Sequence, residues 1–323
     1  MDKKKIYNNF FNLNYNRTNE KQKSKARDYI VDSLKGMYKI NIAHEKYFKH
    51  KISPHSCYNL ESKNSDYKVL LTAHYDTHIG RHTYIQAFIS RELQNKGPIL
   101  PAILHLLLMV ILTLFLYIFL NFKIIYGFVL SFILVLFNLM GIPLCIPNKA
   151  KPFRPAPVHD DNNSGIIALI YIAKLLYEKG QSAKIKLLFT DCEEKGMLGS
   201  KLFVQNNFEN LKNKIIINLD CVGRGSNIFI TFKNNSKLAK ELQCFFLSKN
   251  INTTLSTKSC SDDKSFQEFG FNSVGLIRGD KDPHGNKLIH WTHTPHDTLD
   301  NINIDYITEM IELVTEFIKL QIQ

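Results

Sequence analysis

Three apolar, strand-like runs in this chain of 323 residues stop at acidic or histidine residues. The run YKVLLTA is followed directly by His74 and then by Asp76. A second run ends shortly before Glu193 and Glu194, and a third ends at Asp220. Side chains at the carboxyl ends of strands in open α/β sheets lie at one edge, where such sheets place their sites. The pattern therefore predicts an α/β fold with a polar site at that edge.

Hydrophobic periodicity supports the same fold class. Strands that alternate with amphipathic or buried helices indicate a largely parallel sheet covered by helices on both faces. We predict helices at 18–35, 164–178, 237–248 and 304–320, and strands at 67–73, 185–190, 215–219 and 228–232.

The net charge and the cysteine content indicate which partners and which cellular compartment to expect. The formal net charge is +12, but no arginine-rich stripe with interleaved aromatic residues is present, so we expect no nucleic-acid partner. The 6 cysteines form no CxxC pair and suggest no disulfide framework, which favours free thiols in a reducing compartment. The first residues are lysine-rich without an apolar core, so we do not expect a signal peptide.

A long apolar segment interrupts the α/β pattern. Residues 97–122 and 124–148 contain no Asp, Glu, Lys or Arg, and Lys123 lies alone between them. Each half is long enough to cross about 30 Å of hydrocarbon as a helix. A helix pair buried in a soluble domain is the alternative, but soluble helices normally keep a polar face. We predict a transmembrane helical hairpin at 97–148, inserted between two parts of one domain, 1–96 and 149–323.

Basic residues on both flanks of the hairpin predict its orientation. Arg91 and Lys96 precede it, and three basic residues follow it closely, whereas only Lys123 lies at the turn. The positive-inside rule therefore predicts a two-span membrane protein with both flanks and the catalytic domain in the cytoplasm.

The first two polar segments offer metal ligands. His74 and Asp76 are two apart on an extended segment and so point to the same side, which suits a ligand and the carboxylate that orients it. A simple His–Asp hydrogen bond in a turn is the alternative. Asp161 lies in the segment DDNNSG directly before a helix, where N-capping is also possible. Its two carboxylate oxygens could bridge two cations, and His159 is an alternative ligand.

The later segments supply further carboxylates. Glu193 and Glu194 would repel each other at a strand end unless a cation lay nearby, although loop glutamates can also be solvated. Asp220 ends an apolar strand, where burial without a partner would be costly. His293 lies in a loop that also contains His290 and His296, so its chemistry alone does not single it out. Nitrogen and oxygen ligands favour zinc, with cobalt or manganese possible.

The ordered motifs resemble the zinc-dependent di-metal aminopeptidase family, whose members include secreted bacterial leucyl aminopeptidases and the glutaminyl cyclases. The matching segments are HYDT from His74, DNNSG from Asp161, EEKGMLGS from Glu193, NLD ending at Asp220, and HTPHDTLD from His293. The match covers essentially the whole chain except the hairpin.

The resemblance implies residue roles and an activity. One zinc ion would be held by His74 and Asp220, a second by Glu194 and His293, and Asp161 would bridge them. Glu193 would be the general base, and Asp76 would orient His74. The fold would be a three-layer α/β/α domain with a mixed, mostly parallel central sheet. The activity would be that of an exopeptidase on peptides with a free N-terminus.

Two positions depart from the family pattern, and relatives with other roles supply two alternatives to the peptidase. Thr292 stands where some members have a tyrosine before the last histidine, and Asp263 stands where SDHxxF has its histidine. The oxyanion donor and the substrate contacts are therefore not assigned. The alternatives are a glutaminyl cyclase, which relatives run with a single metal, and an inactive membrane scaffold.

Overall fold

A computed structural model describes residues 2–13, 15–48, 54–78, 159–233, 235–281, 287–289, 291–293 and 297–322. The chain divides into one unit of residues 1–79 with 155–323 and a second unit of residues 80–154. Only the first unit is described below. The predicted hairpin at 97–148 lies outside the described residues, so the hairpin and its domain boundaries remain predictions. Within the described ranges, no helix is both long and apolar enough to span a bilayer.

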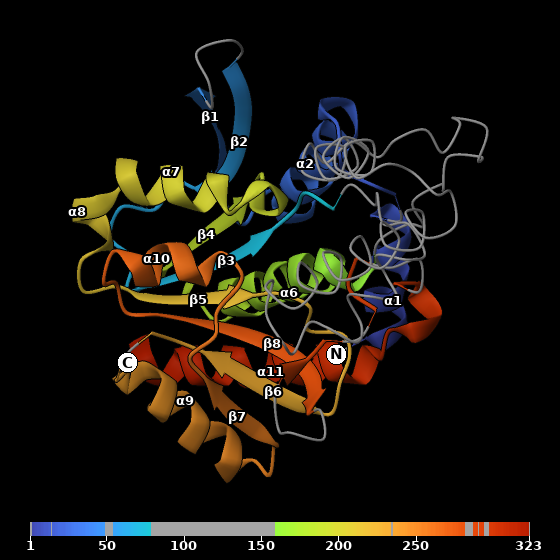
Figure 1. The fold of residues 1–323 in the computed structure, drawn as a ribbon, viewed down its shortest axis with the longest axis vertical. Coiled ribbons are helices and arrows are strands. Elements are labelled where there is room, and N and C mark those ends of the chain that lie inside the picture. Colours follow the sequence, from blue (N-terminus) through green and yellow to red (C-terminus); the bar gives the residue numbers. More distant parts are fainter. Residues whose placement is uncertain are drawn as a thin grey trace, which may run out of the picture. The chain divides into compact units, whose positions relative to one another are not determined.

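The described part of the chain is built on a nine-stranded sheet (Figure 1). Its four central strands, in the order β4-β3-β5-β8, are all parallel, whereas β2 and β6 flank them in antiparallel pairing. The outer strands β1 and β7 complete the order β1-β2-β4-β3-β5-β8-β6-β7, and β9 pairs with β8. The strands are β1 Ile40–Phe48, β2 Pro54–Ser62, β3 Val69–His74, β4 Ile185–Thr190, β5 Ile215–Leu219, β6 Asn227–Thr231, β7 Thr253–Ser256, β8 Ser273–Lys281 and β9 Lys287–Leu288.

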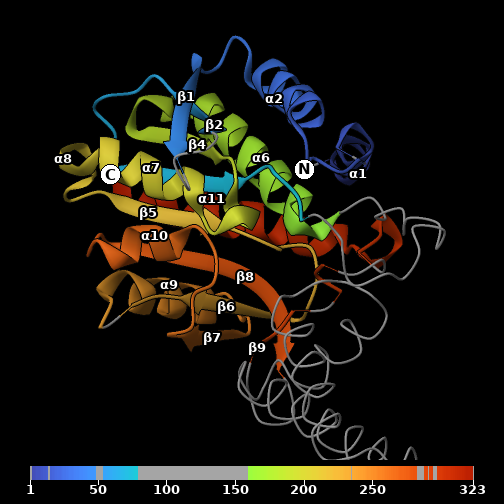
Figure 2. The same cartoon turned by 45° about the horizontal axis from the view of Figure 1, so that its top comes forward.

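Helices cover both faces of this sheet, as the two views show (Figures 1 and 2). On one face, α6 packs against β3, β4 and β5, and α11, α1 and α2 pack against α6. On the other face, α10 packs on β5 and β8, and α7 packs beside α10. The helices are α1 Lys3–Asn12, α2 Glu20–Leu34, α6 Gly165–Glu178, α7 Leu198–Asn206, α8 Phe208–Leu211, α9 Lys237–Ser248, α10 Asp263–Glu268 and α11 Ile304–Ile322.

The alternation of side chains along the central strands separates the core into two layers. In β3, Val69 and Leu71 belong to the apolar cluster that contains α6 and α11, whereas Leu70 belongs to the cluster that contains α7 and α10. Neighbouring strands follow the same rule, with Leu188 and Ile216 on the α7 side. Because successive strand residues point to opposite faces, an all-apolar strand feeds both layers. This explains why the central strands read as continuous apolar runs.

The eight predicted helices and strands are all present, with boundaries that differ by no more than two residues. The parallel centre of the sheet confirms the prediction of an α/β fold with a mostly parallel sheet. The helix predicted from residue 18 begins at Glu20 because Asn19 caps it, with the Gln22 side chain completing a capping box.

Five strands, β1, β2, β7, β8 and β9, are not predicted from the sequence, and β8 shows a physical reason. Arg278 is fully buried within it, which breaks the apolar pattern by which strands are recognised. Its guanidinium pairs with Glu309 of α11 and lies over the Tyr306 ring. A charge inside a strand is tolerated here because a helix brought by tertiary folding supplies its partners.

Candidate metal centre

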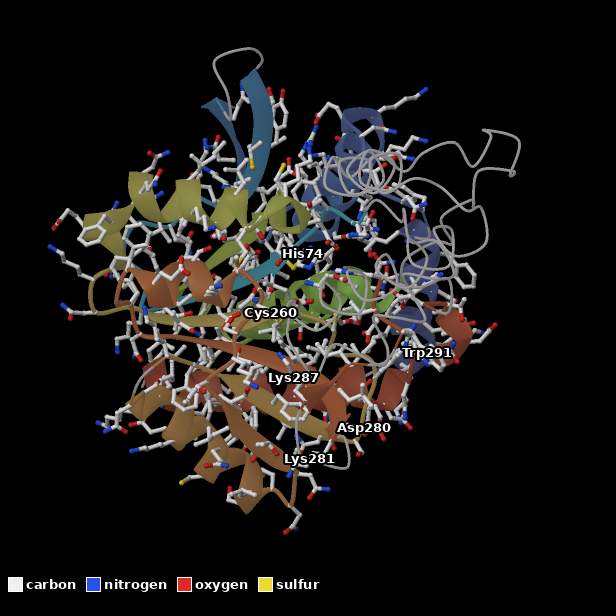
Figure 3. The ribbon with its side chains drawn as sticks, viewed as in Figure 1. His74, Cys260, Asp280, Lys281, Lys287 and Trp291 are labelled. Carbon is white, nitrogen blue, oxygen red and sulfur yellow. The ribbon has the colours of Figure 1, made fainter. Side chains whose placement is uncertain are left out.

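The predicted site residues meet at one edge of the sheet. His74 ends β3, Glu193 and Glu194 follow β4, and Asp220 follows β5. These three strands are parallel neighbours, so their carboxyl ends lie together. Figure 3 labels His74 at the end of β3. Asp161 joins them from the short π-helical turn Asp160–Ser164 that leads into α6, and the loop before α11 supplies His293.

The Asp161 carboxylate lies between two groups of side chains. Its Oδ1 is 3.2 Å from His74 Nε2, and its Oδ2 is 2.9 Å from His293 Nε2. On the first side, His74 Nε2 is also 3.5 Å from Asp220 Oδ1. On the second side, His293 Nε2 is 3.3 Å from Glu194 Oε2. One carboxylate therefore faces two separate ligand groups, the arrangement that a bridging ligand requires.

Asp76 contacts both the first histidine and the glutamate pair. His74 Nδ1 lies 3.2 Å from the backbone carbonyl oxygen of Asp76 and 3.6 Å from the Asp76 carboxylate. That carboxylate also accepts the backbone N–H groups of Glu193, at 3.0 Å, and Glu194, at 3.3 Å. An acceptor at Nδ1 leaves Nε2 of His74 to face Asp161 and Asp220. Asp76 thus fixes the backbone that carries the glutamates as well as lying beside His74.

Two motif glycines permit close backbone approaches around the site. A Cβ atom on Gly165 would lie 2.3 Å from Asn162 Oδ1 and 2.5 Å from the Leu219 carbonyl oxygen. A Cβ atom on Gly199 would lie 2.2 Å from the Asp191 carbonyl oxygen. Neither space admits a side chain, so both positions require glycine for packing. The glycines of these motifs bring α6 and α7 up against the strand ends.

A second buried carboxylate holds the Asp161 turn. Asp297 accepts the backbone N–H groups of His159, Asp160 and Asp161 at 3.2, 2.9 and 3.3 Å. Arg224 neutralises it through an ion pair of 2.5 Å, and both side chains are almost fully buried. The segment after His293 is therefore tied to the turn that presents Asp161.

Charge in the cluster explains the direction of the pKa shifts. Burial lowers the pKa of His293, but Asp161 and Glu194 outweigh it and raise the pKa to about 11. Burial also lowers the pKa of His74, yet its contacts with Asp161 and Asp220 raise it well above its usual value. The surrounding carboxylates thus favour the protonated, positively charged form of both imidazoles when no metal is bound. A divalent cation supplies the same charge, so metal uptake would displace these protons.

Glu193 and Glu194 differ from ordinary surface glutamates. Burial, followed by the nearby Asp161, raises the pKa of Glu194 to about 7, although His293 opposes the shift. Burial raises the pKa of Glu193 well above its usual value, and Asp262 and Asp220 add to the effect while His74 opposes it. A carboxylate whose charged form is disfavoured in this way takes up a proton readily, which suits a general base.

The donor set fits zinc. The groups His74, Asp161, Asp220 and His78, Glu194, His293 each place their ligand atoms within 4.8 Å of one another. Among the described residues, Asp220 Oδ1 and Glu194 Oε1 are buried with no hydrogen-bond partner. Buried carboxylate oxygens without a hydrogen-bond partner, on residues that lie beside imidazoles, are what a cation would satisfy. Imidazole and carboxylate ligands without sulfur are typical of catalytic zinc sites.

Two nearby residues were not predicted, and one predicted alternative falls elsewhere. His78 stacks on the His293 ring, with centroids 4.2 Å apart, and joins the second group of ligand atoms. Asp262, whose Oδ2 accepts the Thr190 hydroxyl, lies close enough to raise the pKa of Glu193. His159, the alternative ligand, belongs to neither group and instead donates its backbone N–H to Asp297. His290 and His296 lie outside the described residues.

Comparison of the sequence with models of protein families identifies the family of this chain. Residues 151–318 match the model of peptidase family M28. The chain belongs to this family. Aminopeptidase YwaD of Bacillus subtilis is 28% identical over 178 residues, which are 51% of this chain and 37% of that protein. The chain thus matches little more than a third of this curated relative's length.

Solved structures agree on the fold of this M28 chain. Glutaminyl cyclase of Porphyromonas gingivalis superposes with a TM-score of 0.65 at 15% identity, covering 99% of this chain and 97% of that one. A Zn-dependent exopeptidase of Parabacteroides distasonis superposes with a TM-score of 0.63 at 17% identity, covering 98% of this chain and 97% of that one. The B. subtilis zinc aminopeptidase BSAP superposes with a TM-score of 0.52 at 19% identity, covering 81% of this chain and 49% of that one. Relatives of this M28 chain therefore include both zinc aminopeptidases and glutaminyl cyclases.

Proposed function

We propose that this M28 chain is an aminopeptidase that holds two zinc ions and removes residues from the free N-terminus of peptides. The observation that carries the proposal is the position of Asp161, whose two oxygens face His74 at 3.2 Å and His293 at 2.9 Å. His74 and Asp220 would hold one ion, and Glu194 and His293 the other, with Asp161 between them. Cobalt or manganese could replace zinc in this donor set.

Zinc, when bound, lowers the pKa of coordinated water and polarises the scissile carbonyl. Glu193 accepts the proton of the attacking water and then gives it to the leaving amine. Its backbone N–H is held by Asp76 at 3.0 Å, which fixes the carboxylate relative to His74.

The proposal is tested by matched peptides that differ only in their N-terminus. Zinc-loaded protein purified in detergent is assayed with a free peptide and with its acetylated form. Cleavage of the free peptide alone supports an aminopeptidase, because an acetyl group removes the charged amine. A metal-to-protein ratio near two supports the two-ion site.

Other outcomes of the same assay favour the alternatives. Pyroglutamate formation from a peptide with N-terminal glutamine, together with a metal ratio near one, would replace the peptidase with a glutaminyl cyclase. Neither reaction, in protein that binds no metal, would favour an inactive scaffold. The complete set of His74, Asp161, Glu194, Asp220 and His293 supports catalysis over the scaffold.

Membrane attachment is a further part of the proposal. The uncharged segments of 97–148 support a two-span anchor, and their basic flanks support a cytoplasmic catalytic domain. A peptidase so placed would act on cytoplasmic peptides close to the bilayer.

A further inference from the structure

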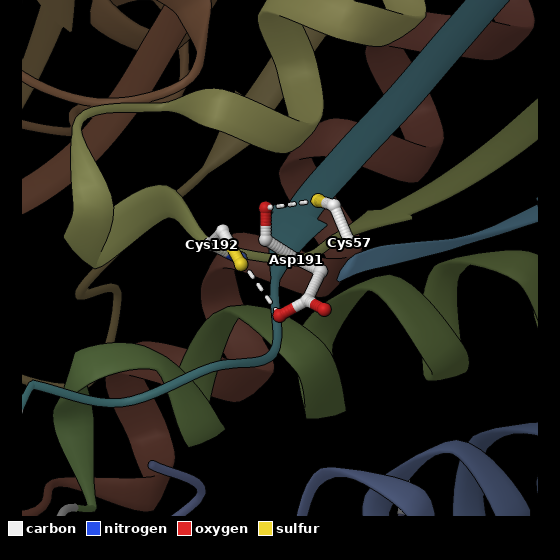
Figure 4. A group of neighbouring side chains, drawn as sticks. All are labelled: Cys57, Asp191 and Cys192. Atoms are coloured by element: carbon white, nitrogen blue, oxygen red, sulfur yellow. Dashed lines mark hydrogen bonds between the residues drawn. The ribbon is translucent and has the colours of Figure 1, made fainter. Parts of the chain in front are cut away.

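A buried cluster lies beside the segment that carries Glu193 and Glu194. Cys57 of β2, Asp191 and Cys192 place two sulfur atoms and a carboxylate oxygen within 4.8 Å of one another (Figure 4). All three residues are buried. The Cys57 thiol donates to the Asp191 carbonyl oxygen at 3.4 Å, and the Cys192 N–H donates to the Asp191 carboxylate at 2.8 Å.

The donor atoms are those of a metal site, but a lysine already supplies the positive charge. Lys23 of α2 is 5% exposed, and its ammonium nitrogen lies 2.7 and 2.9 Å from the two Asp191 carboxylate oxygens. The same nitrogen lies 3.7 Å from Cys192 Sγ. Burial lowers the pKa of Lys23, but Asp191 outweighs it and the net pKa is raised, so the ammonium stays charged. The cluster is therefore a buried ion pair rather than a third metal site.

Asp191 joins three elements to the segment that follows it. Besides Lys23 of α2, its carboxylate accepts the backbone N–H of Tyr58 in β2 at 3.0 Å. Its own N–H donates to Asn59 Oδ1 at 3.0 Å, and its carbonyl oxygen accepts the N–H of Gly199 in α7 at 3.0 Å. One side chain and its peptide groups thus link α2, β2 and α7 immediately before the glutamates.

The glutamate segment has a backbone that needs such support. Cys192 has φ 58°, Met197 has φ 60° and Gly196 has φ 90°, all in the left-handed region. Non-glycine residues adopt this region at a cost and keep it only where surrounding contacts hold them. The Asp191 carboxylate holds the segment by accepting the Cys192 N–H. The Asp76 carboxylate holds it by accepting the N–H groups of Glu193 and Glu194.

We propose that Lys23 and Asp191 are positioning residues that hold Glu193 at the metal centre. The proposal rests on the proposed peptidase function only for its kinetic readout. The Lys23 ammonium offsets the charge of the buried Asp191 carboxylate and holds it through two hydrogen bonds, and Asp191 sets the backbone from which the two glutamates project. A helix outside the motifs of the metal centre thereby determines the alignment of the general base.

The test compares Lys23→Met with Lys186→Met. Lys186 is a suitable control because it also lies nearly buried, pairs with Glu61 at 2.7 Å and joins the same strands β4 and β2, but at the far end of β4. We expect Lys23→Met to lower kcat at least about tenfold with little change in KM, since misplacement of a catalytic group by about 1 Å has effects of this size. Amide hydrogen exchange should rise in residues 191–197 only. Lys186→Met should leave kcat and this exchange unchanged.

A double variant keeps the proposal testable if Lys23→Met fails to fold. Lys23→Met with Asp191→Asn removes both charges, so no buried charge is left unpaired. We expect this variant to fold, yet to retain the lower kcat and the faster exchange at 191–197. Wild-type kcat and wild-type exchange in the double variant would overturn the proposal. If the wild-type protein cleaves no peptide, the proposed function fails, whereas the exchange measurement still decides the role of Lys23.

Discussion

Glu193, unlike its neighbour Glu194, is not part of either group of ligand atoms. It lies beside Glu194 on the same short turn, with its backbone fixed by Asp76. Two adjacent carboxylates thus have different surroundings, because Glu194 faces His293 whereas Glu193 belongs to neither ligand group. When two neighbouring carboxyl groups have different surroundings, one can bind a cation while the other transfers a proton.

Replacement of Glu193 by glutamine separates these two tasks. We expect Glu193→Gln to lower kcat by about 10²- to 10⁴-fold, because the amide cannot accept the proton of the attacking water. Metal content should stay at the wild-type ratio, since Glu194 and His293 are untouched. Steady-state kinetics and elemental analysis of the same sample check both expectations. Near-full activity in the variant would assign the base to another group.

The sequence identifies the site residues that end apolar runs or lie in the family's motifs, and misses those that do neither. His74, Glu194 and Asp220 follow runs whose pairing into parallel strands brings them together. Lys23 and His78 have no comparable local signal. Lys23 lies on a helix 168 residues from Asp191 along the chain, and only the packing of α2 brings the two together. Contacts of this kind depend on the whole fold.

The turn Asp160–Ser164 is the element that presents Asp161, and its shape depends on one acceptor. Three successive backbone N–H groups, those of residues 159–161, converge on the Asp297 carboxylate. Sequence alone indicates an N-cap or a ligand at this turn, and the structure adds an external carboxylate that holds it. The signal in the sequence was the acidic residue four positions after His293. Its partner could not be inferred without the fold.

Asp297→Asn is therefore expected to loosen the turn. The amide oxygen can accept fewer of these bonds, and Arg224 loses its charged partner, so we expect a destabilisation of about 1–3 kcal/mol. Zinc affinity should fall as well, because Asp161 is no longer held between the two histidines. Urea unfolding and competition with a zinc chelator measure the two effects. Asp300→Asn, at an exposed acid in the next turn, is the control and should change neither.

Strand prediction succeeded for three of the four central strands, β3, β4 and β5, and for β6, but missed β8 and the other strands. The centre is buried on both faces, so its strands are continuous apolar runs that can be recognised without knowledge of their neighbours. The hairpin of β1 and β2 carries polar residues such as Asn41 and Glu61 along its length, and β8 contains Arg278. These strands depend on pairing and on partners from distant helices.

Across the whole molecule, the candidate metal centre gathers acidic side chains whose negative charge a bound cation would offset. Asp76, Asp161, Asp220, Glu193 and Glu194 converge at one edge of the sheet with two imidazoles. Ligands that bind only the folded state stabilise it in proportion to the logarithm of their excess over Kd. Metal content should therefore control stability as well as activity.

Removal of metal is expected to lower Tm by about 5–10 °C, the shift that corresponds to about 3 kcal/mol in a domain of this size. Differential scanning calorimetry before and after treatment with a chelator measures the change, and zinc added back should reverse it. An unchanged Tm in protein shown to have lost its metal would mean that the cluster does not bind a stabilising ion.

The predicted orientation of the hairpin in the membrane can be tested by finding which side of the bilayer residue 122 faces. We expect a single engineered cysteine in place of Phe122 to react with an impermeant thiol reagent added to intact cells, because the turn should face outward. Cysteines placed in the catalytic domain, such as at Lys179, should react only after the cells are lysed. The reverse labelling pattern would place the domain outside the cytoplasm.

The central place of β3 has a consequence for biosynthesis. Its neighbours β4 and β5 begin at Ile185 and Ile215, more than a hundred residues later in the chain. During synthesis, β3 therefore remains an apolar strand with both edges unpaired until the ribosome has made the residues up to the end of β5 at Leu219. Such non-local pairing slows folding and exposes strands to aggregation. Maturation of this protein should thus depend on how long the ribosome and its attendant chaperones shield residues 69–74.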